Sequence, residues 1–293
     1  MNKQLRLPGK TAIFLCAVLW STAGLFITII PWHPLVIAGG RSFLATIFLL
    51  VLRRMTAKKE SGEQKKSLSP LILSVGAVCY ALAMILFVIA NRMTSPANAI
   101  LLQYASPIWA ALLGWLFLKE KPFWQQWVSL AMVGCGMLIF FSNTLGGGAL
   151  TGDIIAFISG ITFAASLVFL RKAKNHSPLD IMIYANILTT IVSIPFFILH
   201  PPIMTTASIL SILFLGIFQT GIAVALFSYG IKKVTSLQAM LIVAIEPVLS
   251  PVWVLLGTGI APLTSTIIGG SIIVIAVIFS STSTKILKPL RSS

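Results

Sequence analysis

The residue whose type and position are best suited to chemistry is Glu246, the single acid within an otherwise apolar stretch. The stretch covers residues 235–256 and reads TSLQAMLIVAIEPVLSPVWVLL. Placing a carboxylate in a membrane segment costs about 2.5–3.5 kcal/mol on insertion scales, so such a residue usually has a function. Glu246 could bind a cationic part of a solute, or it could carry a proton, as acids do in pumps and transporters. The structural alternative is an acid that pairs with a neighbouring side chain.

Two prolines follow this acid, Pro247 directly and Pro251 one helical turn later. Proline has no amide hydrogen, so the carbonyl group four residues earlier loses its helical partner. Within lipid, such a backbone group persists only where protein or a wet cavity satisfies it. We therefore predict that residues 235–256 form a broken transmembrane helix that lines a site, with Pro247 and Pro251 as helix-breaking residues.

Polar and aromatic side chains in other apolar stretches are candidates for the same site. Small polar residues there often only join helices, for about 0.6 kcal/mol each. A tryptophan in the middle of a span fits either packing or a site, because lipid-facing tryptophans prefer the interfaces. An aromatic face could bind an apolar side chain or a cation. With Glu246, the predicted substrate-binding residues are Trp20, Tyr80, Gln103, Tyr104, Trp109, Ser166, Gln219 and Gln238.

One basic residue, Arg41, also lies inside an apolar stretch. A long basic side chain near a helix end can extend outward and keep its charge in water. A guanidinium can instead pair with a carboxylate of the protein or of a solute, which it matches in bidentate fashion. We expect Arg41 to reach the outer interface or to pair structurally, and we leave substrate binding as the alternative.

The composition places these residues in a membrane protein. The chain has 293 residues, of which 57% are hydrophobic and 9% are charged. Soluble domains carry about 25% charged residues. The formal net charge of +15 does not indicate nucleic-acid binding, because the basic residues lie between the apolar segments, as on the inner side of a membrane. No nucleic acid is therefore expected as a partner.

A transmembrane helix needs about 20 apolar residues, and ten such segments nearly fill the chain. The sequence thus predicts an all-α integral membrane protein with ten transmembrane helices and no room for a soluble domain. The predicted spans are residues 11–30, 34–53, 70–90, 95–118, 123–142, 151–170, 178–199, 207–231, 235–256 and 263–282.

The distribution of lysine and arginine predicts the orientation. If the N-terminus is cytoplasmic, every Lys and Arg except Arg41 and Arg92 falls in a cytoplasmic segment. Such a bias of basic residues sets the topology of membrane proteins. We therefore expect a multi-pass protein of the bacterial cytoplasmic (inner) membrane, with both termini in the cytoplasm.

An internal repeat links the fourth and ninth spans. Pro107 and Pro247 lie 140 residues apart, and the same shift places Ser106 on Glu246. The chain is thus predicted to contain two five-helix repeats, residues 1–145 and 146–293, with Pro107 also breaking a helix. Because five is odd, the repeats would be inverted, an arrangement in which transporters bind solutes at the midplane between the halves. Chance similarity among apolar helices is the alternative.

Signatures of enzymes and cofactor sites are absent from the sequence. It contains no HExxH, no GxSxG and no Gly-rich phosphate loop, and its three histidines fall at segment ends. No metal, cofactor or catalytic residue is expected, and the protein is not expected to be an enzyme. The rival classes are a channel, a membrane-embedded lipid-modifying enzyme, and a scaffold or receptor subunit without flux of its own.

The ten predicted spans, the paired prolines and the motif Leu118-Lys119-Glu120-Lys121 resemble the EamA-type transporters of the drug/metabolite transporter superfamily. The stretch PIWAALLGWLFLKE, residues 107–120, is similar to that family's pattern, with Lys119 in place of the usual glycine. In the second half, residues 257–260 read GTGI and lack the acid that the family often has there. The resemblance covers nearly the whole chain and implies secondary transport of small metabolites, often efflux of amino acids or toxic compounds and sometimes uptake.

The expected function is therefore secondary transport of a small organic metabolite, an amino acid or related compound, across the cytoplasmic membrane by alternating access. Efflux is the expected direction, and proton coupling is left open. The expected partners are a small-molecule substrate, membrane lipid and, if coupling exists, protons. The expected oligomeric state is a monomer or a weak homodimer.

Overall fold

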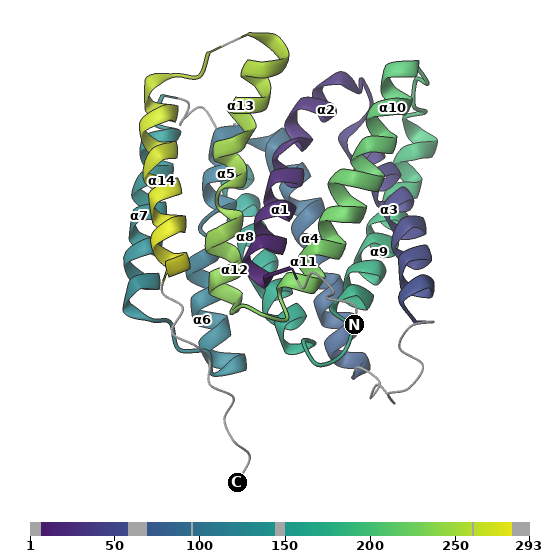
Figure 1. Cartoon of the computed structure of the whole chain (residues 1–293). Helices are drawn as coiled ribbons and strands as arrows, with labels where there is room; N and C mark the ends of the chain where they lie inside the picture. The colour runs from purple at the N-terminus through teal and green to yellow at the C-terminus, as the bar shows by residue number, and fades with distance from the viewer. Residues whose placement is uncertain (1–6, 58–68, 95, 144–149, 260, 283–293) are drawn as a thin grey trace, which may run out of the picture.

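All regular structure in the described part of the chain is helical. The structure is a computed structural model, and it describes residues 7–57, 69–94, 96–143, 150–259 and 261–282. The helices run side by side along one common direction, and α14 ends at the same end of the molecule at which α1 begins (Figure 1). The prediction of an all-α fold is confirmed, whereas the predicted repeat boundary at residues 145 and 146 lies outside the described residues.

Each predicted span contains one helix or a run of consecutive helices. Short interruptions divide the first, fourth and ninth of these segments, and the eighth is continuous but contains a π-helix. The elements are α1 Gly9–Ser21, α2 Ala23–Ile29, α3 Pro34–Ala57, α4 Pro70–Met93, α5 Pro96–Gln103, α6 Ser106–Leu118, α7 Trp124–Phe140, α8 Leu150–Lys172, α9 Pro178–Leu199, α10 Thr206–Phe214, the π-helix η1 Leu215–Ile222, α11 Ala223–Gly230, α12 Ser236–Val243, α13 Glu246–Thr258 and α14 Thr264–Thr282.

The helices make this a multi-pass membrane protein. Eight helical stretches of the described residues are long and apolar enough to cross a bilayer. Two further apolar helices, Trp124–Phe140 and Thr264–Ser280, are shorter than this length. The count of ten spans therefore stays a prediction.

Two of the helical rods are interrupted at matching positions. The interruption between α5 and α6 is at residues 104–105, and the one between α12 and α13 is at residues 244–245. Pro107 and Pro247 are each the second residue of the helix that follows, a position where proline costs no hydrogen bond within that helix. All four helix boundaries in the first rod recur 140 residues later in the second.

Pro251 departs from its prediction, because it lies inside α13 and the helix continues through it. The hydrogen bond that Pro251 cannot make would have reached the carbonyl group of Pro247, in the first turn of the same helix. One missing bond is tolerated in a membrane helix where neighbouring groups satisfy the freed carbonyl. Pro251 is therefore an internal proline of a continuous helix.

The same two rods also end alike. Lys119 follows α6 with φ of 56°, and Gly259 follows α13 with φ of 73°, so both adopt the left-handed conformation. This conformation is common at the C-terminus of a helix and favours glycine, which has no Cβ atom to clash. It explains why the family pattern has glycine where this chain has Lys119. The turn at Lys119 also lets the amide N–H of Glu120 donate to the carbonyl group of Gly114 at 3.2 Å.

Glu120 then takes part in a cluster that ties three helix ends together. Its Oε1 accepts from Nε of the buried Arg171 at 2.8 Å, and its Oε2 accepts from the backbone N–H of Ser236 at 3.0 Å and its hydroxyl at 3.1 Å. Arg171 also donates to the carbonyl groups of Ile231 at 3.1 Å and Lys232 at 2.6 Å. The Glu120–Arg171–Ser236 cluster thus joins the end of α6, the end of α8 and the start of α12.

Close helix packing completes the fold. The most extensive contacts join α4 with α8, α7 with α14, and α3 with α9. At the crossing of α7 and α14, a Cβ atom on Gly269 would lie 2.5 Å from the carbonyl oxygen of Gly136. Only glycine allows this approach. The pair α7–α14 forms one side of the molecule, away from α3 and α9 (Figure 1).

Candidate functional site

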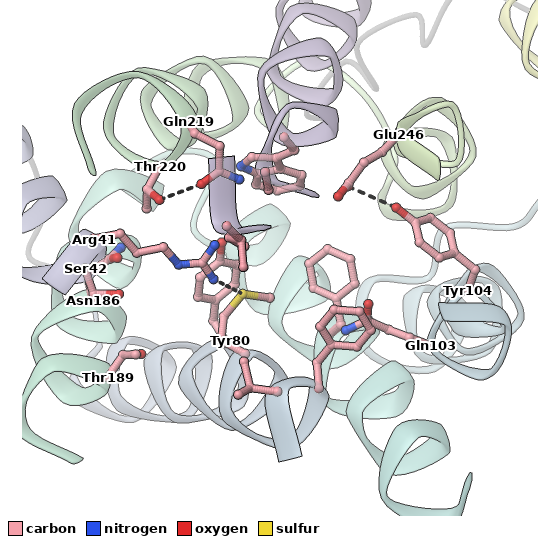
Figure 2. A pocket seen from close by; sticks show the side chains of 17 residues that line it. Arg41, Ser42, Tyr80, Gln103, Tyr104, Asn186, Thr189, Gln219, Thr220 and Glu246 are labelled. Carbon is pink, nitrogen blue, oxygen red and sulfur yellow. Dashed lines mark hydrogen bonds between the residues drawn. The ribbon is translucent and has the colours of Figure 1, made fainter. Parts of the chain in front are cut away.

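A polar cavity lies among the helices at the level of the two matched interruptions. It has a volume of ≈ 160 Å³ and is lined by side chains from α1, α2, α3, α4, α5, α8, α9, η1, α13 and the residue that follows α5. This volume holds several water molecules or one small metabolite. The cavity brings together charged, amide and aromatic side chains from segments far apart in the sequence (Figure 2).

One side of the cavity carries an acid held by a tyrosine. Glu246 is the first residue of α13, and Tyr104 lies in the interruption between α5 and α6. The Tyr104 hydroxyl donates a hydrogen bond to Oε2 of Glu246 at 3.0 Å. The two interrupted rods therefore meet at the cavity through these two side chains, which were both predicted site residues (Figure 2).

The opposite side of the cavity carries a base. Arg41, on α3, points into the cavity from the side opposite Glu246 (Figure 2). The expectation that it extends to the outer interface therefore does not hold. Its Nη2 lies 4.0 Å from the sulfur of Met84, which is a weak acceptor. Among the described residues, no carboxylate forms an ion pair with Arg41.

Polar side chains from α3, α9 and η1 surround this arginine. Ser42, Asn186, Thr189, Gln219 and Thr220 all line the cavity, and each is buried against the protein. Thr220 donates to Oε1 of Gln219 at 3.0 Å, so the amide nitrogen of Gln219 is the end left to face the cavity. Gln219 and Thr220 lie on the π-helix η1, a type of helix that frequently marks functional sites.

Three aromatic side chains form an aromatic wall of the cavity. Trp20 of α1, Tyr80 of α4 and Phe163 of α8 line the cavity and are almost fully buried. The ring centroid of Phe163 is 6.3 Å from that of Trp20 and 6.4 Å from that of Tyr80. The Trp20 ring also stacks on Phe227 at 5.5 Å, which fixes its orientation.

Gln103 lines the cavity, but its amide is used within the protein. Its Nε2 donates to the Ser159 hydroxyl at 2.9 Å, and that hydroxyl donates to the carbonyl oxygen of Ala83 at 3.0 Å. This chain of hydrogen bonds joins α5 to α8 and α4. Gln103 therefore holds the interrupted rod in place as well as bordering the cavity.

Three predicted site residues lie outside the cavity. Trp109 is in α6 and packs edge-on against Phe157, with ring centroids 5.6 Å apart. The Ser166 hydroxyl donates to the carbonyl group of Phe163, one turn earlier in α8, at 2.7 Å. Gln238 lies buried in the first turn of α12, where its backbone N–H donates to the Thr235 hydroxyl at 3.2 Å. Trp109 thus makes an aromatic contact and Ser166 bonds within its own helix, and the capping group at Gln238 is the Thr235 hydroxyl.

The prediction omitted Ser42, Asn186, Thr189 and Phe163, which all line the cavity. Asn186 gave the clearest missed signal, because it is an amide in the middle of the apolar span 178–199. Phe163 and Ser42 carried no such signal, since serine and phenylalanine are common in packed membrane helices. Within the described residues, no group of three or more His, Cys, Asp or Glu side chains could hold a metal ion.

Comparison with known proteins assigns the chain to a family. The model of the EamA-like transporter family matches residues 7–142 and 150–282, nearly the whole chain. The chain belongs to the EamA-like transporter family. It is therefore a member of a family of membrane transporters, and the resemblance expected from the sequence is confirmed.

Two relatives of this EamA-like chain carry transporter names. One, from Archaeoglobus fulgidus, is named as an uncharacterized transporter; it is 28% identical over 241 residues, covering 82% of this chain and 83% of its own. Another, from Buchnera aphidicola, is named as an uncharacterized transporter in the trpA 3' region; it is 26% identical over 259 residues, with the same coverage of 82% and 83%. Family and relatives thus indicate a transporter and not an enzyme.

The EamA-like chain also shares its fold with a known crystal structure. The two chains are 18% identical and superpose with a TM-score of 0.77, over 94% of this chain and 96% of the other. At this level of identity the likeness concerns the fold alone.

Proposed function

We propose that this protein is a secondary transporter that moves a small organic metabolite, an amino acid or related compound, across the bacterial cytoplasmic membrane by alternating access. The observation that carries the proposal is the cavity, in which Glu246, Arg41 and an aromatic wall meet among membrane-spanning helices. Charged side chains inside a membrane protein mark solute or ion pathways. Membership of a transporter family and a cavity that holds charged side chains together favour solute binding over packing.

We further propose that residues 1–145 and 146–293 form two inverted repeats around this cavity. The two stretches matched by the family model, residues 7–142 and 150–282, support this division. So does the helix packing, which is reciprocal when the halves are exchanged. Contacts of α4 with α8, α4 with α9, and α5 with α8 correspond to contacts of α11 with α1, η1 with α3, and α12 with α1.

Alternating access requires that the cavity open to each side in turn. The cavity includes Ala23 and Ile27 of α2, at the end of the molecule opposite the Glu120–Arg171–Ser236 cluster (Figure 1). The distribution of basic residues supports a cytoplasmic position for that cluster and for both termini. We propose that the cluster closes the cytoplasmic end in this conformation and separates when the cavity opens inward, with efflux as the net direction.

Within this mechanism, Glu246 binds either a cationic group of the solute or a proton that is exchanged for it. Tyr104 holds the carboxylate at the junction of the two interrupted rods. Trp20 and Tyr80 contact the apolar part of the solute, and Gln219 offers its amide. Pro107 and Pro247 keep the two rods interrupted, so that Tyr104 and Glu246 reach the cavity.

The test is transport by the purified full-length protein in liposomes, with a panel of labelled amino acids and a set pH gradient. We expect counterflow of at least one solute to saturate with concentration, and Glu246→Gln to reduce it at least about tenfold. If protons are exchanged, the same substitution removes the response to the pH gradient. Asp180→Asn, at the surface end of α9, is the matched control and should transport normally.

Two results would count against the proposal. An ion current that does not saturate would favour a channel, and absence of counterflow for every solute in a folded sample would exclude transport of this class. Normal flux and normal pH response in Glu246→Gln would instead show that the role given to Glu246 is wrong.

A further inference from the structure

The wall of the cavity formed by α3, α9 and η1 carries a cation whose hydrogen-bonding capacity is almost unused. We infer that this wall binds an oxyanion of the transported solute, a carboxylate or a chemically similar group, with Arg41 as its anchor. The inference rests on the proposed function, because it names the solute group that the same cavity receives. It also predicts how the solute lies: its oxyanion against Arg41, and its hydrogen-bond donors toward Glu246.

The first argument is the state of the Arg41 guanidinium. It has five N–H donors, yet its partner among the described residues is the Met84 sulfur at 4.0 Å. The other inward arginine of the described chain, Arg171, has a carboxylate and two carbonyl groups within hydrogen-bond distance. The buried Arg171 thus has an ion pair and two further hydrogen bonds, whereas the hydrogen bond of Arg41 goes to a weak sulfur acceptor. An arginine inside a membrane protein that lacks a partner is expected to receive one from a ligand.

The second argument is the chemistry of the neighbouring side chains. The side-chain carbonyl oxygen of Gln219 accepts a hydrogen bond from the Thr220 hydroxyl. Gln219 therefore presents its amide N–H₂ group to the cavity. The hydroxyl of Ser42, next to Arg41 on α3, can also donate. Asn186, Thr189 and Thr220 donate within the protein, so Gln219 and Ser42 are the donors that this wall adds to the guanidinium. These donors, without an acid among them, favour an anion over a cation.

The third argument is the position of the acid. Glu246 lies on the far side of the cavity from Arg41 (Figure 2). Its carboxylate would repel a second negative charge on the solute but accept a hydrogen bond from a donor. The cavity therefore has a cation on one side and an acid on the other. It fits a solute with one oxyanion and a distant hydroxyl, amide or ammonium group better than it fits a dianion.

The experiment compares small probes that share one body and differ in charge, using full-length protein in detergent. The probes are phenylacetate, its neutral amide phenylacetamide, phenethylammonium and the phosphonate analogue benzylphosphonate. Binding is measured by isothermal titration and by the shift in thermal midpoint. We expect phenylacetate to bind at least about tenfold more tightly than the amide, because only the carboxylate pairs with Arg41 in bidentate fashion. Comparing phenylacetate with benzylphosphonate tells whether the wall prefers a planar monoanion or a larger and more highly charged anion.

The matched variants are Arg41→Gln, Arg41→Lys and, as a control on the same helix, Arg53→Gln. Arg41→Gln should weaken phenylacetate binding about 30-fold or more and leave amide binding unchanged. Arg41→Lys should fall between the two, because an ammonium keeps the charge and loses the planar fork. Arg53→Gln removes the same charge far from the cavity, so it should bind all four probes like the unmodified protein.

The comparison of probes on unmodified protein needs no variant, so poor folding of Arg41→Gln would not block the test. A lack of preference for phenylacetate over phenylacetamide, or tighter binding of phenethylammonium than of both, would overturn the inference. Arg41-dependent anion binding without flux in liposomes would leave the inference standing and refute the proposed transport. Saturable flux that depends neither on the anionic group of the solute nor on Arg41 would support the proposed transport and refute the inference about Arg41.

Discussion

At the scale of single residues, the cavity is lined by charged and polar side chains that are unusual in the apolar helices of a membrane protein. Glu246 and Tyr104 were predictable because an acid and a tyrosine are conspicuous in apolar stretches of the sequence. The direction in which Arg41 points was not, because position within a span does not say which face of the helix meets a cavity. That face is set by the packing of α3 against α9 and η1.

The left-handed residue Lys119 gives a prediction at this scale. Glycine at this position would remove the steric cost of the left-handed conformation, about 1–2 kcal/mol, and would lose part of that gain to the greater freedom of the unfolded chain. We expect Lys119→Gly to raise the free energy of unfolding in mixed micelles by about 0.5–1 kcal/mol. Denaturant titration followed by circular dichroism measures this.

Two companion substitutions sharpen the test. Lys121→Gly, in the exposed loop that follows, removes the same side chain without relieving strain and should give no gain. Gly259→Ala, at the equivalent position after α13, should be destabilising because its φ of 73° disfavours a Cβ atom. A loss of stability in Lys119→Gly would show that the left-handed conformation of Lys119 does not strain this helix end.

At the scale of elements, the interruptions of the two matched rods are what bring side chains to the cavity. Prolines made these interruptions visible in the sequence, since the missing amide hydrogen is a local property. The π-helix η1, which packs against α3, had no such signal in the sequence. Pro251 shows the limit of the proline argument: a missing hydrogen bond does not by itself end a helix.

Pro247 supplies the prediction for these elements. In Pro247→Ala the new amide N–H can donate to the carbonyl group of Val243 and join α12 to α13 in one continuous helix. We expect the thermal midpoint to stay equal or rise, while solute flux in liposomes falls at least about tenfold, as Glu246 moves out of register with Tyr104. Flux and thermal midpoint are measured on the same preparation.

The control for this change is Pro251→Ala, which alters the same helix one turn later without bridging an interruption. It should change flux by less than about threefold, since no cavity residue moves. Equal losses in the two variants would mean that any proline in α13 matters for flux, and that the interruption itself does not.

At the scale of the whole molecule, the crossing of α7 and α14 and the Glu120–Arg171–Ser236 cluster are two of the contacts that join distant parts of the chain. Neither was predicted. Glu120 lies in a charged turn that resembles an ordinary cytoplasmic loop, and Gly269 is one of several glycines in an apolar helix. Their importance arises from contacts between residues far apart in the sequence, which a pattern along one segment cannot report.

Gly269→Val tests the helix crossing. A Cβ atom would overlap the carbonyl oxygen of Gly136, so the two helices must separate, and we expect a loss of about 1–3 kcal/mol in the free energy of unfolding. Gly134→Val is the matched control, because a Cβ atom at Gly134 meets no atom within 4 Å. Equal stability of the two variants would show that the close approach of α7 and α14 is not needed.

Arg171→Met tests the cluster. Removing the guanidinium leaves the Glu120 carboxylate, whose side chain is 17% exposed, without its ion-pair partner. Breaking such a pair should cost about 3 kcal/mol and lower the thermal midpoint. Arg53→Met, which breaks the pair with Asp180 and whose side chain is 50% exposed, should cost at most about 1 kcal/mol. Similar midpoints for the two variants would contradict a stabilising role for the cluster.

The register between the two interrupted rods has one more consequence. Ser106 and Glu246 begin α6 and α13, so the same backbone position carries a hydroxyl in one rod and a carboxylate in the other. The Ser106 hydroxyl contacts the Met240 sulfur at 3.7 Å, whereas Glu246 faces the cavity. The two matched rods therefore carry different charge at the same position. An asymmetric solute would therefore bind in the same orientation whichever side of the membrane it entered from. Reversing the direction of transport would not reverse the orientation of the bound solute.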